Sequence, residues 1–338
     1  MESPILLAVP NISEGRDAAT IEEIGRAFVG ADGASTSFQG GDTGFNGGSR
    51  TAVSLLDVHS DADHHRSVFT LAGGTLALSD ALLRGGRTVV ERVDVIARER
   101  AEIGQHPHVG ALDVVPIVYL DLTARGAAFA TALVVADRIG QELSVPVFLY
   151  GEMTASEHGG GRSRAEVRRG GIGLLAERIA AEPAHAGRGS EGPDGRGALE
   201  AMRPDFGPAR MHATAGATLV AARPPLVAFN LQLAAPSTLA DARRIASLIR
   251  EGGPEGLPGL RAIGIALSGD RAQVSMNVER PLEVPLAIVI EAVGRHARVE
   301  RAELVGLAPL AALEGLPGEI PMPGFDAARH VIENAIGC

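Results

Sequence analysis

The sequence contains no lysine and no tryptophan, and Cys338 is its only cysteine. A single thiol cannot build a disulfide framework within the chain, an iron–sulfur ligand set or a cysteine zinc site. Without lysine there is neither a phosphate-loop lysine nor a Schiff base, so pyridoxal chemistry is excluded. All 31 basic residues are therefore arginine.

Long apolar runs are missing as well. No stretch approaches the roughly 18 residues that indicate a membrane span, and Met1–Ile5 has no basic region leading into an apolar segment, so no secretion signal is predicted. The formal net charge of −10 argues against a nucleic-acid partner, because phosphate binding needs a basic face. We expect a cytoplasmic enzyme that binds neither membrane nor nucleic acid.

With 338 residues the chain can form two lobes, each with its own core. A subdomain is predicted over residues 1–182, a linker rich in glycine, alanine and proline over 183–203, and a second subdomain over 204–338. The glycine-rich stretch 30–50 predicts a loop. Hydrophobic periodicity in the first half predicts strands near 5–10, 52–58, 68–72, 114–120 and 145–150, and helices near 21–28, 75–92, 123–143 and 162–181.

The second half is predicted to run strand, strand, helix, strand, strand, helix, strand. Its first helix has clear boundaries, because Ser237 or Thr238 can cap its start and Gly252 follows its end. The apolar residues of that helix share one face: Leu239, Ala242, Ile245 and Ile249.

Two strands in this half alternate clearly between apolar and polar residues, over 227–233 and 272–278. Their polar faces carry amides and a hydroxyl but no charge, on Asn230, Gln232, Gln273, Ser275 and Asn277. Such a face suits the wall of a cleft that recognises a polar ligand. The alternative is an ordinary solvated sheet face.

Histidine marks the candidate chemistry, because it gathers in two short segments, residues 57–66 and residues 104–113. In the second segment Pro107 fixes the backbone directly after His106, and Gly110 permits a tight turn. A histidine held in this way is suited to proton transfer, because its pKa lies near neutrality. The alternative is that these histidines are capping or solvated loop residues.

The first histidine segment also allows a metal site. His59, His64 and His65 lie among aspartates, and Asp63-His64-His65 is the tripeptide that names a family of metal-dependent phosphoesterases. A metal-dependent hydrolase or phosphoesterase that uses the His59–His65 cluster is therefore an alternative function.

A series of motifs runs through both halves in one order. It comprises Val9–Gly15, His65–Val68, His106–Pro107 with Gly110–Val114, Val145–Glu152, Pro204–Pro208, Gly216–Thr218, Ala228–Asn230, Ala272–Asn277 and Leu304–Leu307. In these motifs the chain resembles the glutamate formimidoyltransferases, the stand-alone bacterial form of the formiminotransferase domain of formiminotransferase-cyclodeaminase.

The resemblance implies an α/β (α+β) fold of two ferredoxin-like lobes. Each lobe would be a mixed β-sheet with helices on its outer face, and a ligand tunnel would lie between them. The implied reaction moves a formimino group from formiminoglutamate to N5 of tetrahydrofolate in histidine degradation. Tetrahydrofolate would serve as co-substrate, no metal is expected, and the implied assembly is a homodimer.

The resemblance also implies site residues. His106 takes the place of the catalytic histidine, with His59 and Arg66 beside it, and Arg66 suits a substrate carboxylate. Transfer between two amines requires one nitrogen to lose a proton and the other to gain one, which a histidine can do in both steps. The implied substrate- and folate-binding residues are Asn11, Ser13, Gly207, Pro208, Ala209, Arg210, Met211, His212, Ala213, Thr214, Ala215 and Gly216.

Some positions depart from the mammalian pattern. His59 stands in place of an aspartate that assists the catalytic histidine, and Gln105 replaces a glutamate. Met211 and Ala215 stand where an aromatic residue and a tryptophan occur, which reduces the surface for ring stacking. These departures leave two alternatives: a formyl rather than formimino donor, and a folate-binding paralogue without turnover.

Overall fold

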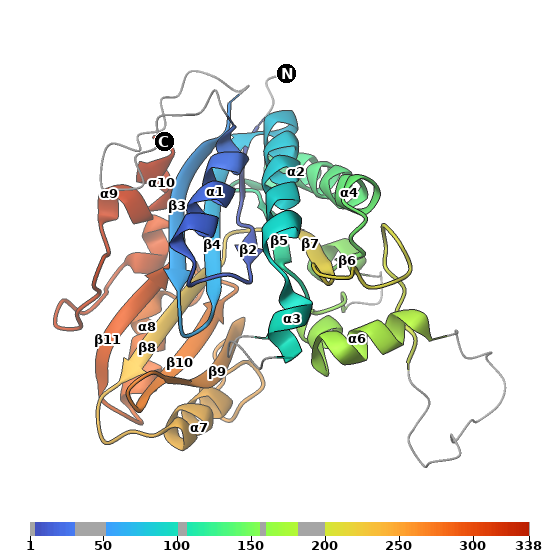
Figure 1. Ribbon diagram of the computed structural model, residues 1–338. Coiled ribbons are helices and arrows are strands. Elements are labelled where there is room, and N and C mark those ends of the chain that lie inside the picture. The colour runs from blue at the N-terminus through green and yellow to red at the C-terminus, as the bar shows by residue number, and fades with distance from the viewer. Residues whose placement is uncertain (1–3, 31–51, 101–106, 156–159, 182–199, 338) are drawn as a thin grey trace, which may run out of the picture.

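The computed structural model describes residues 4–30, 52–100, 107–155, 160–181 and 200–337. Two β-sheets pack with their inner faces toward each other, and most helices lie on the outer faces (Figure 1). No helix among the described residues is long and apolar enough to cross a membrane. The glycine-rich stretch predicted as a loop, residues 30–50, lies almost entirely outside the described residues.

The first sheet has seven strands: β1 (Ile5–Ala8), β2 (Asn11–Ile12), β3 (Ser54–Asp61), β4 (Arg66–Gly74), β5 (Leu112–Val118), β6 (Val147–Leu149) and β7 (Thr218–Arg223). β1 and β2 both pair with β4 and β5, because Pro10 interrupts what is otherwise one central strand. β3 pairs antiparallel with β4, whereas β7 runs parallel to both β5 and β6.

The helices of the first lobe are α1 (Ala18–Val29), α2 (Thr75–Arg92), α3 (Val95–Arg100), α4 (Arg125–Glu142), α5 (Arg164–Arg168) and α6 (Gly171–Ala180), with short 3-10 turns η2 (Leu122–Ala124) and η3 (Gly151–Thr154). α1, α2 and α4 cover one face of the first sheet (Figure 1). The single helix predicted over 162–181 is two helices instead. Gly170 and Gly171 both adopt positive φ, 76° and 71°, which interrupts the helical hydrogen bonds.

The second lobe contains β8 (Val227–Leu233), α7 (Leu239–Ile249), β9 (Leu260–Leu267), β10 (Arg271–Val278), α8 (Leu286–Gly294) and β11 (Val299–Val305). Its antiparallel strands lie in the order β11-β8-β10-β9, which is ferredoxin-like. The same succession occurs in the first lobe, where β1 with β2, α1, β3, β4, α2 and β5 form the corresponding unit and β7 and β6 extend it. The prediction of two such lobes is confirmed, with the difference that only the first sheet is mixed and the second is antiparallel throughout.

The final segment contains η4 (Leu310–Leu313), α9 (Ala327–His330) and α10 (Ile332–Ala335), and it returns to the first lobe (Figure 1). Ile332 and Ile336 pack against Leu7 and Leu56 of the first sheet. The chain changes from the first sheet to the second between Arg223 and Val227. The predicted linker, residues 183–203, precedes β7, and most of it lies outside the described residues.

Two local predictions have clear outcomes. The start of α7 is confirmed, because the Thr238 hydroxyl accepts from the backbone of Asp241 and the Asp241 carboxylate accepts from Thr238 in return. The end predicted for β3 near residue 58 is wrong, because its pairing with β4 continues to Asp61. The polar residues that suggested an end face the space between the sheets, so they do not disturb the ladder.

Close packing of α7 on β9 depends on Gly264, where an added Cβ would lie 2.3 Å from the Arg243 backbone nitrogen. We expect Gly264→Ala to lower the free energy of unfolding by about 1–3 kcal/mol, because the helix must move away from the sheet. Gly126→Ala is the matched control, since a Cβ there meets nothing within 4 Å. Urea denaturation measures both changes, and equal stability of the two variants would contradict the prediction.

Candidate functional site

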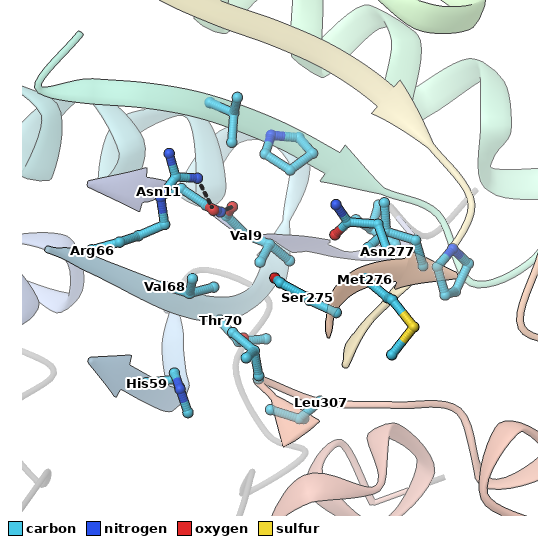
Figure 2. Close-up of a pocket in the computed structure, with 18 of the residues that line it drawn as sticks. Val9, Asn11, His59, Arg66, Val68, Thr70, Ser275, Met276, Asn277 and Leu307 are labelled. Atoms are coloured by element: carbon cyan, nitrogen blue, oxygen red, sulfur yellow. Dashed lines mark hydrogen bonds between the residues drawn. The ribbon is translucent and has the colours of Figure 1, made fainter. Parts of the chain in front are cut away.

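A cavity lies between the inner faces of the two sheets, with an empty volume of about 1120 Å³ that includes open solvent at its mouth. Figure 2 shows Asn11, Arg66 and Val68 on the first sheet, with Ser275 and Asn277 entering from β10. The predicted polar stripes therefore line cavities, as expected: Asn230, Ser275 and Asn277 lie on the wall of this one, and Gln232 and Gln273 on that of a neighbouring cavity.

Strand register explains how distant residues meet on the first wall. His59 is paired with Val68, Val68 with Asn11, and Asn11 with Val114, so one row of side chains crosses four strands. Because side chains directly opposite in a sheet share a face, all four line the cavity. In the second sheet the corresponding row joins Glu303, Asn230 and Ser275.

Arg66 is fixed by three partners. Its Nη2 lies 2.6 Å from Asp113 Oδ2, its Nη1 donates to Asn11 Oδ1 at 3.0 Å, and Nη2 also donates to the Pro107 carbonyl at 3.3 Å. Arg168 donates to the same Asp113 oxygen. Burial alone would raise the pKa of Asp113, but the charges of Arg168 and Arg66 hold it well below its usual range.

One carboxylate therefore faces two arginines in this part of the cavity, which leaves an excess of positive charge. Burial lowers the pKa of Arg66 to about 10 despite the attraction of Asp113, so the guanidinium stays charged at neutral pH. Arg164 and Arg223 also line the cavity, and burial lowers the pKa of Arg223 to about 10. The arrangement favours an anionic group at this side of the cavity.

Three buried polar atoms on this wall lack a hydrogen-bond partner within the described part of the protein: Thr70 Oγ1, Arg168 Nε and Arg223 Nε. Buried donors are normally satisfied, so these atoms are suited to contact a polar ligand. Sequence reasoning missed Arg164, Arg168 and Arg223. The first two stand four residues apart on α5, a spacing that places them on one helix face, whereas Arg223 at the end of an apolar strand gave no signal.

His59 meets a carboxylate from the other lobe. Its Nε2 lies 3.5 Å from Glu303 Oε1, and Glu303 Oε2 accepts from Asn230 Nδ2 at 2.8 Å. Burial would lower the pKa of His59, but the hydrogen bond and charge of Glu303, together with Asp57 and Asp61, raise it. Glu303 was not predicted as a site residue, because its position opposite His59 follows from lobe packing rather than from any local motif.

The side chains of the Asp63-His64-His65 tripeptide diverge. Asp63 bonds to Ser268, His64 Nδ1 lies 2.8 Å from Asp61 Oδ2, and His65 Nδ1 accepts from the Gly15 backbone at 3.0 Å. The hydrogen bonds from His64 outweigh burial and lower the pKa of Asp61 to about 2. Across the described ranges no three histidine, cysteine, aspartate or glutamate side chains are grouped to hold a metal ion.

The remaining predicted site residues lie in different places. Asn11 is on the cavity wall, whereas Ser13 is buried beside it and donates to the Gly110 carbonyl at 2.8 Å. The whole segment 207–216 is described, and it packs near the start of β5, where the Ala111 backbone nitrogen donates to the Ala215 carbonyl at 2.9 Å. This segment lines neither cavity. His106 lies outside the described residues.

Known proteins resemble this chain through both lobes. The family model of the formiminotransferase domain, N-terminal subdomain, matches residues 5–223. Glutamate formimidoyltransferase of Streptococcus pyogenes serotype M1 is 32% identical over 98% of both chains. Glutamate formimidoyltransferase of Thermoplasma acidophilum is 29% identical over 90% of this chain and 88% of its own.

Formimidoyltransferase-cyclodeaminase of Gallus gallus is 32% identical, and the match covers 90% of this chain and 50% of the longer protein. The family model spans more than half of the chain, and the relatives align over nearly all of it. The chain belongs to the formiminotransferase family.

Proposed function

We propose that the protein transfers a formimino group from formiminoglutamate to N5 of tetrahydrofolate. The observation that carries the proposal is the cavity between the lobes of this formiminotransferase-family chain. One wall of the cavity is rich in arginine and the other is polar and uncharged, and His59 lies in it paired with the Glu303 carboxylate. The names of the relatives support a glutamate-derived donor. They do not favour the metal-dependent hydrolase.

The cavity residues fit a reduced folate. The amides and hydroxyl of Asn230, Ser275 and Asn277 can hydrogen-bond a polar ring system. The unpartnered Nε groups of Arg168 and Arg223 suit the carboxylates of a glutamate tail.

His106 is the proposed proton-transfer residue, and Pro107, which follows it, is held by Arg66. His59 is the proposed assistant, with Glu303 supplying the carboxylate that the mammalian aspartate supplies at the His59 position. Arg66 is proposed to bind a substrate carboxylate, and Asn11 to contact substrate beside it. For Ser13 and the segment 207–216 the support is the family resemblance.

We further propose that the protein is a cytoplasmic homodimer. Leu133 and Val134 on α4 are 43% and 48% exposed, which suits a helix face covered by a second copy, and a lone cysteine suits a reducing compartment. Analytical ultracentrifugation should give twice the monomer mass of 34.9 kDa. A monomer at micromolar concentration would contradict the assembly.

Purified protein should form the 5-formimino product from formiminoglutamate and tetrahydrofolate, and a chelator should leave the rate unchanged. His106→Ala should lower kcat by roughly 10²–10⁴-fold, because proton transfer is lost. His296→Ala is the control, since His296 pairs with Glu255 outside the cavity. If only formylglutamate supports transfer, the donor is a formyl rather than a formimino compound. If neither formiminoglutamate nor formylglutamate supports transfer, the protein is a folate-binding paralogue without turnover. Undiminished activity of His106→Ala would remove His106 from the mechanism.

Glu303→Gln should lower the pKa of His59, because the burial that lowers it is no longer outweighed by the charge of Glu303. In the unmodified chain His59 keeps its proton to a higher pH than an ordinary imidazole does. In Glu303→Gln it should lose the proton at a lower pH than in the unmodified chain. An NMR pH titration of the His59 ring measures the shift. Glu255→Gln, beside His296, should leave His59 unchanged. An identical His59 midpoint in Glu303→Gln would show that this pairing does not control its protonation.

A further inference from the structure

A second cavity adjoins the first, and Asp61 and Asn230 belong to the walls of both. Its other walls come mainly from the second lobe, with Arg271 on β10 and Arg301 on β11. A small ligand in this second cavity would therefore lie directly beside a ligand in the main one.

The two arginines are held by one amide. Gln232 Oε1 accepts from Arg301 Nε at 2.9 Å and from Arg271 Nη1 at 3.3 Å. Its Nε2 donates to Glu300 Oε2 at 2.7 Å, which fixes the orientation of the amide so that its oxygen faces the arginines. Gln232 is only 4% exposed and is the register partner of Arg301, so the fold itself sets this arrangement.

An amide oxygen orients two guanidinium groups without neutralising them. Neither Arg271 nor Arg301 forms an ion pair with a carboxylate of the described residues, whereas Arg261 on the neighbouring strand pairs with both Glu251 and Glu279. Two oriented, uncompensated guanidinium groups on a cavity wall form a receptor for a carboxylate.

The wall between the two cavities has the opposite charge. Asp61 belongs to both cavities, and Glu303 lines the second cavity while it pairs with His59 in the first. Formiminoglutamate carries two carboxylates and an amidine, which is a cation at neutral pH. A molecule with an anionic end and a cationic end matches this order of charges.

We propose that the second cavity is the donor subsite, where Arg271 and Arg301 bind a carboxylate of the glutamyl donor and Asp61 and Glu303 face its amidinium group. The proposal rests on the proposed function and assigns the two substrates to two adjoining cavities. The amidine carbon then lies at the shared wall, beside the main cavity, which is proposed for the folate.

Steady-state kinetics on the full chain, with each substrate varied, tests this assignment. Arg271→Gln and Arg301→Gln should each raise the KM for formiminoglutamate by roughly 10- to 100-fold, because one charge-assisted pair is lost. The KM for tetrahydrofolate should stay the same. Arg261→Gln makes the same charge change on β9 outside both cavities and should leave both constants unchanged.

Gln232→Glu gives a second test that keeps the size of the side chain. Its carboxylate would pair with both arginines and should raise the donor KM in the same way. A donor KM unchanged in all three variants, or a tetrahydrofolate KM that rises equally, would overturn the assignment.

Calorimetric titration with L-glutamate separates this inference from the proposed function. The carboxylate subsite is supported if L-glutamate binds to the unmodified chain and to Arg261→Gln but not to Arg301→Gln. This result would stand even if formimino transfer is absent. Glutamate binding that is equal in Arg301→Gln and the unmodified chain overturns the subsite even if transfer occurs.

Discussion

The buried carboxylate of Asp113 organises the main cavity. It is fully buried at the start of β5, where it accepts from the Val109 backbone and binds Arg66 from β4 and Arg168 from α5. The pKa of Asp113 is lower in the folded protein than in the unfolded chain. The stabilisation of the fold by the Asp113 carboxylate is therefore complete above the usual aspartate pKa, and it is lost as the pH falls through the pKa of the folded state. Because removing one partner of a buried pair leaves the other charge uncompensated, the three groups act as a unit.

The site exists only when both lobes are docked. His59 meets Glu303, Asp63 meets Ser268 and Arg164 meets Glu279, so each of these contacts joins a residue of the first lobe to one that follows β7. These three polar contacts surround the cavity, whereas the apolar contact between the lobes comes from Leu307, Ile332 and Ile336, which pack on the first sheet. A ligand in that space touches both lobes and therefore adds to the free energy that holds them together.

Sequence reasoning succeeded where the signal is local. The helix over 75–92 and the order of elements after residue 218 follow from periodicity and capping, and the uncharged stripe on β10 correctly indicated a cavity wall. It failed where partners are distant. Glu303 and Arg223 acquire their places through strand register and lobe packing, and the His64 and His65 side chains diverge because a hairpin turn directs them to different neighbours.

The same register polarises the main cavity across its strands. His59 and Asp61 line the cavity from β3, and His59 pairs with Glu303 on β11, while Arg164, Arg168 and Arg223 line it from α5 and β7. His59 pairs with one of the carboxylates on the acidic side, and Asp113 neutralises one of several arginines on the basic side. Glu303 therefore brings negative charge next to His59 from the second lobe. The polarity that would orient a cationic amidine and an anionic tail depends on the pairing of the two sheets rather than on one strand.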